Sequence, residues 1–308
     1  MDLKLIEKTK GVWINTSYST LLYLLLVVIL GGLISSYLLG SFVCQLVYGI
    51  SFFSSSHQVF VISNPDMMNA MKTMQLFNAV GMFILPPIVF LHLRGLSFTN
   101  YLKLNKSLNG LTIGKVFILA LAMIPLANFL GYINESFPLP EFLNFLKLAE
   151  EQSLVLTEQF LIMDSIWDLG IMILIMGVVA AVGEELLFRG ILQNLFQDWS
   201  KSKHLAVWLT AFLFSVIHLQ YHAVVPRFFL GAFIGYVYVY SGSLRTSIYL
   251  HFFYNTSLVV LSYLIHHEFV SKYWESFGAV SISAVIVTVI LLFSFSYKWF
   301  SNRTTYLN

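Results

Sequence analysis

The stretch from Ala181 to Gly190 reads Ala-Val-Gly-Glu-Glu-Leu-Leu-Phe-Arg-Gly and lies between two apolar runs. It places two adjacent carboxylates and an arginine inside a segment with the composition of a membrane-spanning helix. A charge at the centre of such a helix costs roughly 2.5–3.5 kcal/mol on insertion scales, so it usually faces the protein interior and has a function. These charges are therefore the first candidates for chemistry.

Helical spacing separates the roles of the three charges. Glu185 and Arg189 are four residues apart, so they share a helix face and can form an ion pair. Glu184 is turned about 100° away and has no partner within the stretch. A carboxylate without such a partner is suited to accept a proton. The alternative interpretation is a structural ion pair, with Glu184 facing a water-filled crevice.

Two later apolar segments carry polar side chains at the same spacing of four. The first pairs Phe214 with His218, and the second pairs His251 with Asn255. Each pair projects from one face of its helix. The glutamates, the histidines and the asparagine lie on three apolar helices and could meet in one interior site, where each helps to satisfy the others.

This set of side chains suffices for hydrolysis. A glutamate can take a proton from water while a histidine holds the same water. A second histidine and an asparagine amide can donate hydrogen bonds to a developing oxyanion. The same set could instead bind zinc through Glu184, His218 and His251, with the second carboxylate as base. The usual His-Glu-x-x-His pattern is absent, so these ligands would come from three helices.

The composition predicts an all-α, polytopic membrane protein. Of the 308 residues, 58% are hydrophobic and 10% are charged, against about 25% charged in a soluble domain. We expect one membrane domain over 1–308, with the lipid bilayer as its surroundings. The single Cys44 excludes an intramolecular disulfide and a cysteine metal cluster. The basic residues are scattered rather than gathered on a face, which argues against nucleic acid as a partner.

About eight apolar segments are long enough to be spans. We expect them at 19–40, 75–93, 113–134, 166–197, 204–219, 224–241, 244–265 and 277–300. Two connections are long, at 41–74 and 135–164, and both are expected outside. The first contains the turn signal Asn64-Pro65-Asp66. The second mixes large apolar residues with glutamates, which predicts an amphipathic helix at the membrane interface.

The distribution of lysine and arginine predicts the topology. If the N-terminus is cytoplasmic, the outside segments hold four of these residues: Lys72, Lys147, Arg227 and Lys272. Twelve others fall in inside segments, and Arg189 accounts for the last of the 17. This bias favours an integral protein with both termini in the cytoplasm, in keeping with a prokaryotic cytoplasmic membrane.

Three motifs in order on successive spans resemble the CPBP family of intramembrane proteases, also called Abi proteins. They are Glu-Glu-x-x-x-Arg at 184–189, Phe-x-x-x-His at 214–218 and His-x-x-x-Asn at 251–255. The family comprises CAAX-processing and bacteriocin-processing enzymes and includes the eukaryotic type II CAAX prenyl endopeptidase. The resemblance covers roughly Gly170 to Ser262, so helices within 166–265 would form the catalytic core.

The resemblance implies an eight-helix endopeptidase that cleaves membrane-associated peptides or proteins. Carried over, Glu184 and His218 would activate water, and His251 and Asn255 would form the oxyanion site. Structural support would come from Glu185, Arg189 and Phe214. The family is often labelled metalloprotease. A glutamate mechanism without a cofactor is the preferred interpretation here, because Asn255 is a poor zinc ligand and a good oxyanion donor.

Two other functions and one geometric question remain open at this point. The same cluster could serve a proton- or ion-coupled transporter, which inverted repeats would favour, although none is visible. It could also belong to a non-catalytic scaffold. A shared site further requires that His218, near the outer end of its span, reaches the depth of His251, near the inner end of its own. That demands short, tilted or broken helices. A prenylated substrate is not implied.

Overall fold

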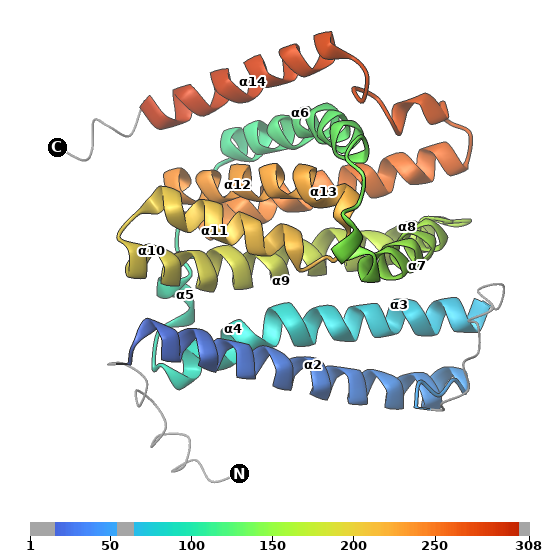
Figure 1. The fold of residues 1–308 in the computed structure, drawn as a ribbon, viewed down its shortest axis with the longest axis horizontal. Helices are drawn as coiled ribbons and strands as arrows, with labels where there is room; N and C mark the ends of the chain where they lie inside the picture. Colours follow the sequence, from blue (N-terminus) through green and yellow to red (C-terminus); the bar gives the residue numbers. More distant parts are fainter. Residues whose placement is uncertain (1–15, 54–64, 302–308) are drawn as a thin grey trace.

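The structure is a computed structural model that describes residues 16–53 and 65–301. These residues form helices and connecting turns, and no strand occurs among them. The helices lie side by side in a bundle, and the start of α2 and the end of α14 lie at the same end of it (Figure 1). The expectation of an all-α fold is confirmed.

The N-terminal pair consists of α2 (Tyr18–Tyr48) and a second, composite helix. The composite helix runs through α3 (Pro65–Ala79), the π-helical η1 (Val80–Ile84) and α4 (Leu85–Leu93). The expected bounds were wrong here, because much of the expected loop 41–74 is helical. Pro65 begins α3 rather than marking a turn, since proline fits the first helical position. Residues 54–64, including Asn64 of the expected turn, lie outside the described part.

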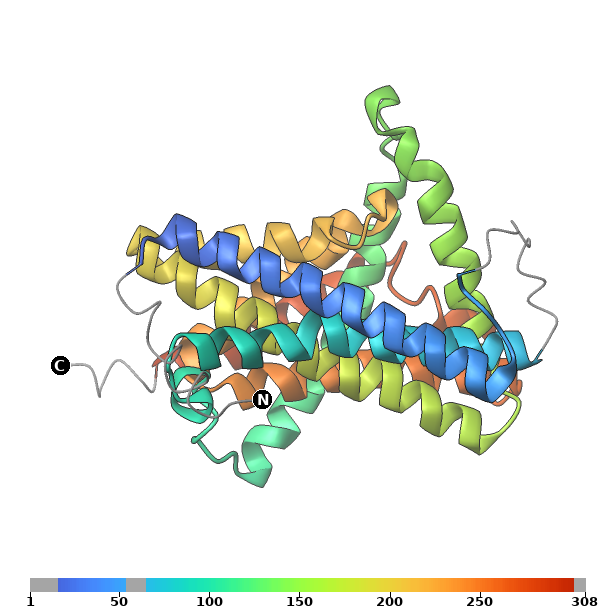
Figure 2. The ribbon, with the colours of Figure 1, turned by 90° about the horizontal axis from the view of Figure 1, so that it is seen from below.

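After the small helix α5 (Phe98–Tyr101), α6 (Gly110–Glu135) crosses the bundle, and η2 (Glu141–Leu143) leads into α7 (Phe145–Phe160). The expectation of an amphipathic helix within 135–164 is confirmed by α7. Phe145, Leu148 and Leu154 are exposed, whereas Glu150 and Phe160 are buried. Figure 2 shows α7 steeply inclined to the long helices, the orientation of a helix that lies along a membrane surface.

The next four long segments include the three that carry the sequence motifs. The first, here called the motif helix (166–200), runs through α8 (Ile166–Met172), η3 (Ile173–Val179), α9 (Ala180–Glu185), η4 (Leu186–Gln193) and α10 (Asn194–Ser200). It is followed by α11 (Lys203–Val216), η5 (Tyr221–Ala223), α12 (Val224–Ser241) and α13 (Leu244–His266). The short η6 (Lys272–Trp274) precedes α14 (Ile282–Ser301).

Six helices of the described chain are long and apolar enough to cross a membrane, and two shorter apolar helices accompany them. The shorter two are α11 and residues 282–292 of α14. This total agrees with a polytopic protein of about eight spans. The motif helix lies inside the bundle and contacts the N-terminal pair closely. A Cβ atom on Gly183 would lie 2.8 Å from the Cβ of Phe83 in η1, so only glycine allows this approach beside the glutamates.

Candidate active site

The centre of the site is a buried chain of three side chains. Glu185 Oε1 accepts a hydrogen bond from Arg189 Nη1 at 2.8 Å, and both side chains are fully buried. The same oxygen lies 2.9 Å from Nδ1 of His251 on α13. The ion pair expected from the spacing therefore forms, and it also holds a histidine from a helix 66 residues away. A carboxylate that accepts two such bonds is fixed in position.

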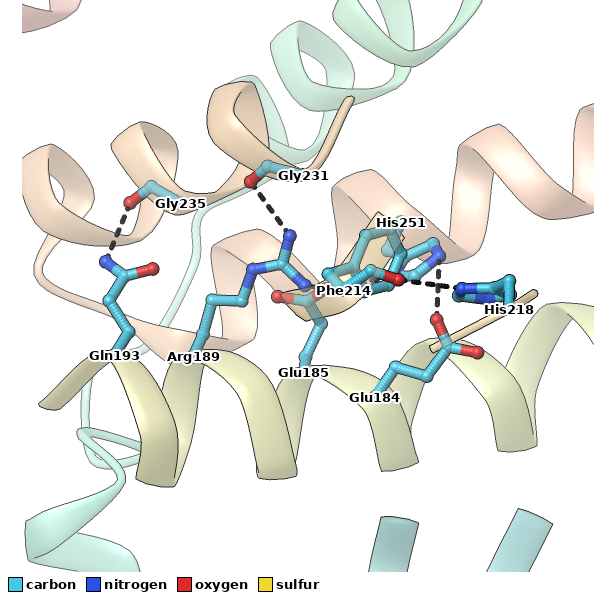
Figure 3. Close-up of polar contacts among 9 residues, drawn as sticks. All are labelled: Glu184, Glu185, Arg189, Gln193, Phe214, His218, Gly231, Gly235 and His251. Atoms are coloured by element: carbon cyan, nitrogen blue, oxygen red, sulfur yellow. Dashed lines mark hydrogen bonds and ion pairs between the residues drawn. The ribbon is translucent and has the colours of Figure 1, made fainter. Parts of the chain in front are cut away.

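Arg189 and Gln193 attach the motif helix to α12. Arg189 Nη2 donates to the carbonyl oxygen of Gly231 at 2.9 Å, and Gln193 Nε2 donates to that of Gly235 at 3.2 Å. In a regular α-helix, residues four apart drift around the axis by about 40° per step. The wider i→i+5 turns of η4 counter this drift. Glu185, Arg189 and Gln193 thus form one row facing the neighbouring helices (Figure 3).

The two glycines of α12 give these side chains room. A Cβ atom on Gly231 would lie 3.1 Å from the Phe214 ring, and one on Gly235 would lie 2.9 Å from Gln193 Oε1. The small-residue spacing in this span therefore serves close helix packing, as such patterns do in membranes. It brings the backbone carbonyls of α12 within reach of the buried arginine.

Glu184 lies beyond the Glu185 end of this row, on the side away from Gln193 (Figure 3). Its Oε2 lies 3.7 Å from Nε2 of His251, and its side chain keeps 12% exposure while that of Glu185 keeps none. His251 consequently has one carboxylate near each ring nitrogen. Figure 3 shows the Glu184 carboxylate directed toward His251, with His218 beside it. The carboxylate expected to lack a partner within its own motif therefore faces two imidazoles from other helices.

His218 lies just beyond the last turn of α11 and caps it. Its Nδ1 is 2.7 Å from the carbonyl oxygen of Phe214. A carbonyl can only accept, so Nδ1 carries the proton and Nε2 is left as an acceptor when the ring is neutral. The turn that follows is strained, because Leu219 has a positive φ of 53°. Such strain is commonly found beside functional sites.

Phe214 packs between the charged groups. Its ring makes edge contacts with His218 at 5.2 Å and with His251 at 6.0 Å, measured between ring centroids. The guanidinium carbon of Arg189 lies 4.9 Å from the centroid of the same ring, a cation–π arrangement. Phe214 therefore sets the spacing between both histidines and the buried ion pair.

Asn255 lies one turn after His251 on α13 and is half-buried. Its Nδ2 donates to the carbonyl oxygen of Met176 in η3 at 2.9 Å. One amide hydrogen is used in this bond, and a second remains on the same nitrogen. The π-helical turn of η3 thus provides the acceptor that orients the amide.

The short length of α11 explains how His218 reaches the depth of His251. This helix has 14 residues, about 21 Å at 1.5 Å per residue, which is shorter than the hydrocarbon core of a bilayer. His218 therefore lies deeper than a full span would place it. It reaches the level of His251, since both rings contact Phe214.

The three candidate zinc ligands were also tested against the geometry. Among the described residues, no group of three or more His, Cys, Asp or Glu side chains is arranged to hold a metal ion. Nδ1 of His218 and Nδ1 of His251 are bonded to oxygens, which leaves Nε2 as the nitrogen of each ring that could bind a ligand. As placed, Glu184, His218 and His251 are not clustered closely enough to hold a zinc ion.

Two polar residues at the site were missed from the sequence. Arg227, counted above among the outside cations, lies in the first turn of α12, and its Nη2 donates to Oε1 of Gln220. Gln220 is buried and donates through Nε2 to Oγ of Ser153 on α7 at 2.7 Å. An arginine inside a predicted span was the signal that could have found this group.

Fold and site together define a polytopic helical membrane protein with a buried Glu/His centre. Residues 166–257 match the model of a protein family described as Type II CAAX prenyl endopeptidase Rce1-like. The match covers the motif helix, α11, α12 and the first half of α13, and it includes all three motifs. This Rce1-like domain confirms the resemblance to the CAAX protease family and supports a peptidase. No significant match was found among curated proteins or among solved structures.

Proposed function

We propose that the protein is an intramembrane endopeptidase in which Glu184 and His218 activate the attacking water. The observation that carries this proposal is the asymmetry of the adjacent glutamates. Glu185 is fully buried and bonded to Arg189 and His251, whereas the Glu184 carboxylate keeps 12% exposure, lies 3.7 Å from His251 and points toward His218 (Figure 3). A proton acceptor needs that freedom, because it must bind water and change its charge during the reaction.

The chemistry follows from these positions. Glu184 takes a proton from water, the water oxygen bonds to the peptide carbonyl carbon, and the carbonyl electron pair moves to its oxygen. Nε2 of His218 accepts a hydrogen bond from the same water. Glu184 then returns the proton to the departing amine as the carbon–nitrogen bond breaks. The products are a carboxylic acid and an amine, so no cofactor is consumed.

His251 and Asn255 are the proposed oxyanion donors. His251 donates its Nδ1–H to Glu185, so its Nε2 can donate to the oxyanion only when the ring is protonated on both nitrogens. The proposal therefore uses His251 as an imidazolium, with Nε2 on the side of Glu184. Asn255 retains a second amide hydrogen beside its bond to Met176. Donors that are fixed before the reaction stabilise the developing charge without reorganisation.

Cleavage of a peptide library by purified protein, with and without a chelator, tests the proposed function. We expect chelator-resistant cleavage that persists through purification and is lost in the variant His218→Gln. His204→Gln is a matched control, because His204 contacts only Tyr236 among the interactions described for it and lies at the far end of α11. Absence of cleavage by wild-type protein in bilayers and in detergent would contradict the proposal. One equivalent of zinc with chelator-sensitive cleavage would contradict the glutamate mechanism alone.

The proposed substrate is a membrane-associated peptide or protein, and the proposed orientation has both termini in the cytoplasm. Supporting the orientation, α7 and the end of α10 lie at opposite ends of the bundle (Figure 1). Cysteines at the exposed positions Glu151 and Lys201, introduced with Cys44→Ser, should label from the outside and the inside respectively. Labelling of position 151 from the cytoplasmic side alone would reverse the assignment.

A further inference from the structure

Arg227 is level with the glutamates on the helix that faces them. The bonds from Arg189 to Gly231 and from Gln193 to Gly235 each join residues 42 positions apart. A constant separation means that the motif helix and α12 run parallel in a fixed register. One turn earlier, the same register places Arg227 opposite Glu185. Its side chain therefore starts at the depth of the reaction rather than at the membrane surface.

One terminal nitrogen of the Arg227 guanidinium is hydrogen-bonded, and the other has no hydrogen-bond partner among the described residues. Nη2 donates to Gln220, which is tied in turn to Ser153 of α7. The backbone N–H of His222, in the same connection, donates to the buried Glu150 of α7 at 2.9 Å. Nη1 of Arg227 is buried and has no hydrogen-bond partner among the described residues. A buried donor in this condition is costly unless something else binds it.

The charges of the site favour Arg227 as a partner for Glu184. Two carboxylates, Glu184 and Glu185, lie within electrostatic range of two guanidiniums, Arg189 and Arg227. Arg189 is bonded to Glu185, which leaves Glu184 as the carboxylate for Arg227. Arg227 also acts electrostatically on His218. The charges of these four side chains balance, and the imidazolium of His251 adds one positive charge to the site.

We propose that Arg227 is a positioning residue that accompanies the negative charge as it passes from Glu184 to the tetrahedral oxyanion. This inference rests on the proposed function. When Glu184 takes the proton of the water it becomes neutral, and the negative charge appears on the former carbonyl oxygen. The net charge of the site does not change, and Arg227 attracts the anion in both states. Fixed charges of this kind supply a large share of catalysis in apolar sites.

An arginine is suited to attract a buried anion throughout the reaction. It stays protonated in proteins, and its spread charge is weakly hydrated, so it tolerates burial better than lysine. The first turn of α12 adds the partial positive charge of a helix N-terminus. The bond to Gln220 restrains the side chain before any substrate arrives, which removes part of the ordering cost.

The test measures kcat and KM of Arg227→Gln and Arg227→Lys on a quenched peptide found in the library experiment. We expect Arg227→Gln to lower kcat on the order of 10²–10³-fold with little change in KM, as for the loss of an oxyanion donor. Arg227→Lys should recover most of this loss. The unfolding temperature of both variants should match that of Arg245→Gln, a control on the exposed start of α13.

Three results would overturn the inference. Near-wild-type kcat in Arg227→Gln would remove any role in the reaction. A loss that lysine does not rescue, together with a lower unfolding temperature, would make the residue structural. A rise in KM confined to peptides with a free C-terminal carboxylate, and absent with their amides, would assign Arg227 to the substrate terminus. In each case the variant Glu184→Gln remains inactive if the proposed function holds. An inactive wild-type protein would contradict both the proposed function and the role of Arg227.

Discussion

The polar side chains of the motif helix fall into two groups, here called the Glu185 half and the Glu184 half, which differ in how closely their charges are paired. In the Glu185 half, Arg189 and Gln193 are bound to α12 and His251 is bound to Glu185, with every one of these side chains at 3% exposure or less. In the Glu184 half, the carboxylate is partly exposed and Nη1 of Arg227 lacks a hydrogen bond among the described residues.

This difference separates stability from chemistry along a single helix. A buried cluster in which each charge is bonded to an opposite charge is rigid, because breaking any pair leaves a buried charge without its partner. A carboxylate without so close a partner can bind water or a substrate. Adjacent residues of the same type thus have opposite duties: Glu185 fixes His251 in place, and Glu184 is left to react beside it.

The largest expected effect is on the Glu184 half. Glu184→Gln keeps the shape of the side chain but removes its capacity to accept a proton. We expect turnover to fall by roughly 10³–10⁴, toward the upper end for the loss of a general base, while the unfolding temperature stays within a few degrees of wild type. Kinetics on the quenched peptide and a melting curve in the same detergent measure both. Near-normal turnover would show that Glu184 is not the proton acceptor.

The Glu185 half should respond in the opposite way. Glu185→Gln leaves the charge of Arg189 fully buried without its carboxylate, which costs about 3–5 kcal/mol when such a pair is broken. We expect a marked fall in unfolding temperature. The double variant Glu185→Gln/Arg189→Met removes both charges and should regain part of that stability. A double variant less stable than the single one would refute the ion-pair interpretation, since the two changes form a thermodynamic cycle.

The sequence could predict the elements and the local pairing but not the packing between helices. Apolar runs indicated the long helices, and a spacing of four indicated the Glu185–Arg189 pair, because both depend on one helix alone. The contact of His251 with Glu185 joins residues 66 apart. It depends on how two helices rotate against each other, which their own periodicity does not determine.

Three other features could not be predicted from the apolar pattern and local spacing of the sequence. The π-helical turns of η3 and η4 are not indicated by the apolar pattern of the sequence, and they set the acceptor for Asn255 and the row that reaches Gly231. The helix before Met74 was hidden by the turn signal near Pro65. Arg227 lies inside the expected span 224–241 but was counted among the outside cations, because its register with Arg189 on a neighbouring helix is a tertiary property.

A smaller effect is expected at Asn255, one turn after His251 on α13. Asn255→Ala removes a proposed oxyanion donor and should lower kcat on the order of 10²–10³-fold. Turnover of wild type should be unchanged by chelators. A defect of only about tenfold, as expected for a residue that merely supports a metal ligand, combined with chelator sensitivity, would favour zinc and place Asn255 outside the reacting groups.

The smallest expected effect is at Gln193, the end of the row farthest from Glu184. Gln193→Met keeps a similar volume and loses the bond to the carbonyl of Gly235, which contributes about 0.5–1.5 kcal/mol. The change also removes Oε1 of Gln193, a buried oxygen without a hydrogen-bond partner in the described part of the chain, so part of the loss is offset. We expect a shift of about 1 kcal/mol or less in unfolding free energy and turnover within twofold of wild type. A large loss of turnover without a loss of stability would mean that Gln193 affects the reaction at Glu184 from the far end of the row. The separation of a structural Glu185 half from a reactive Glu184 half would then be wrong.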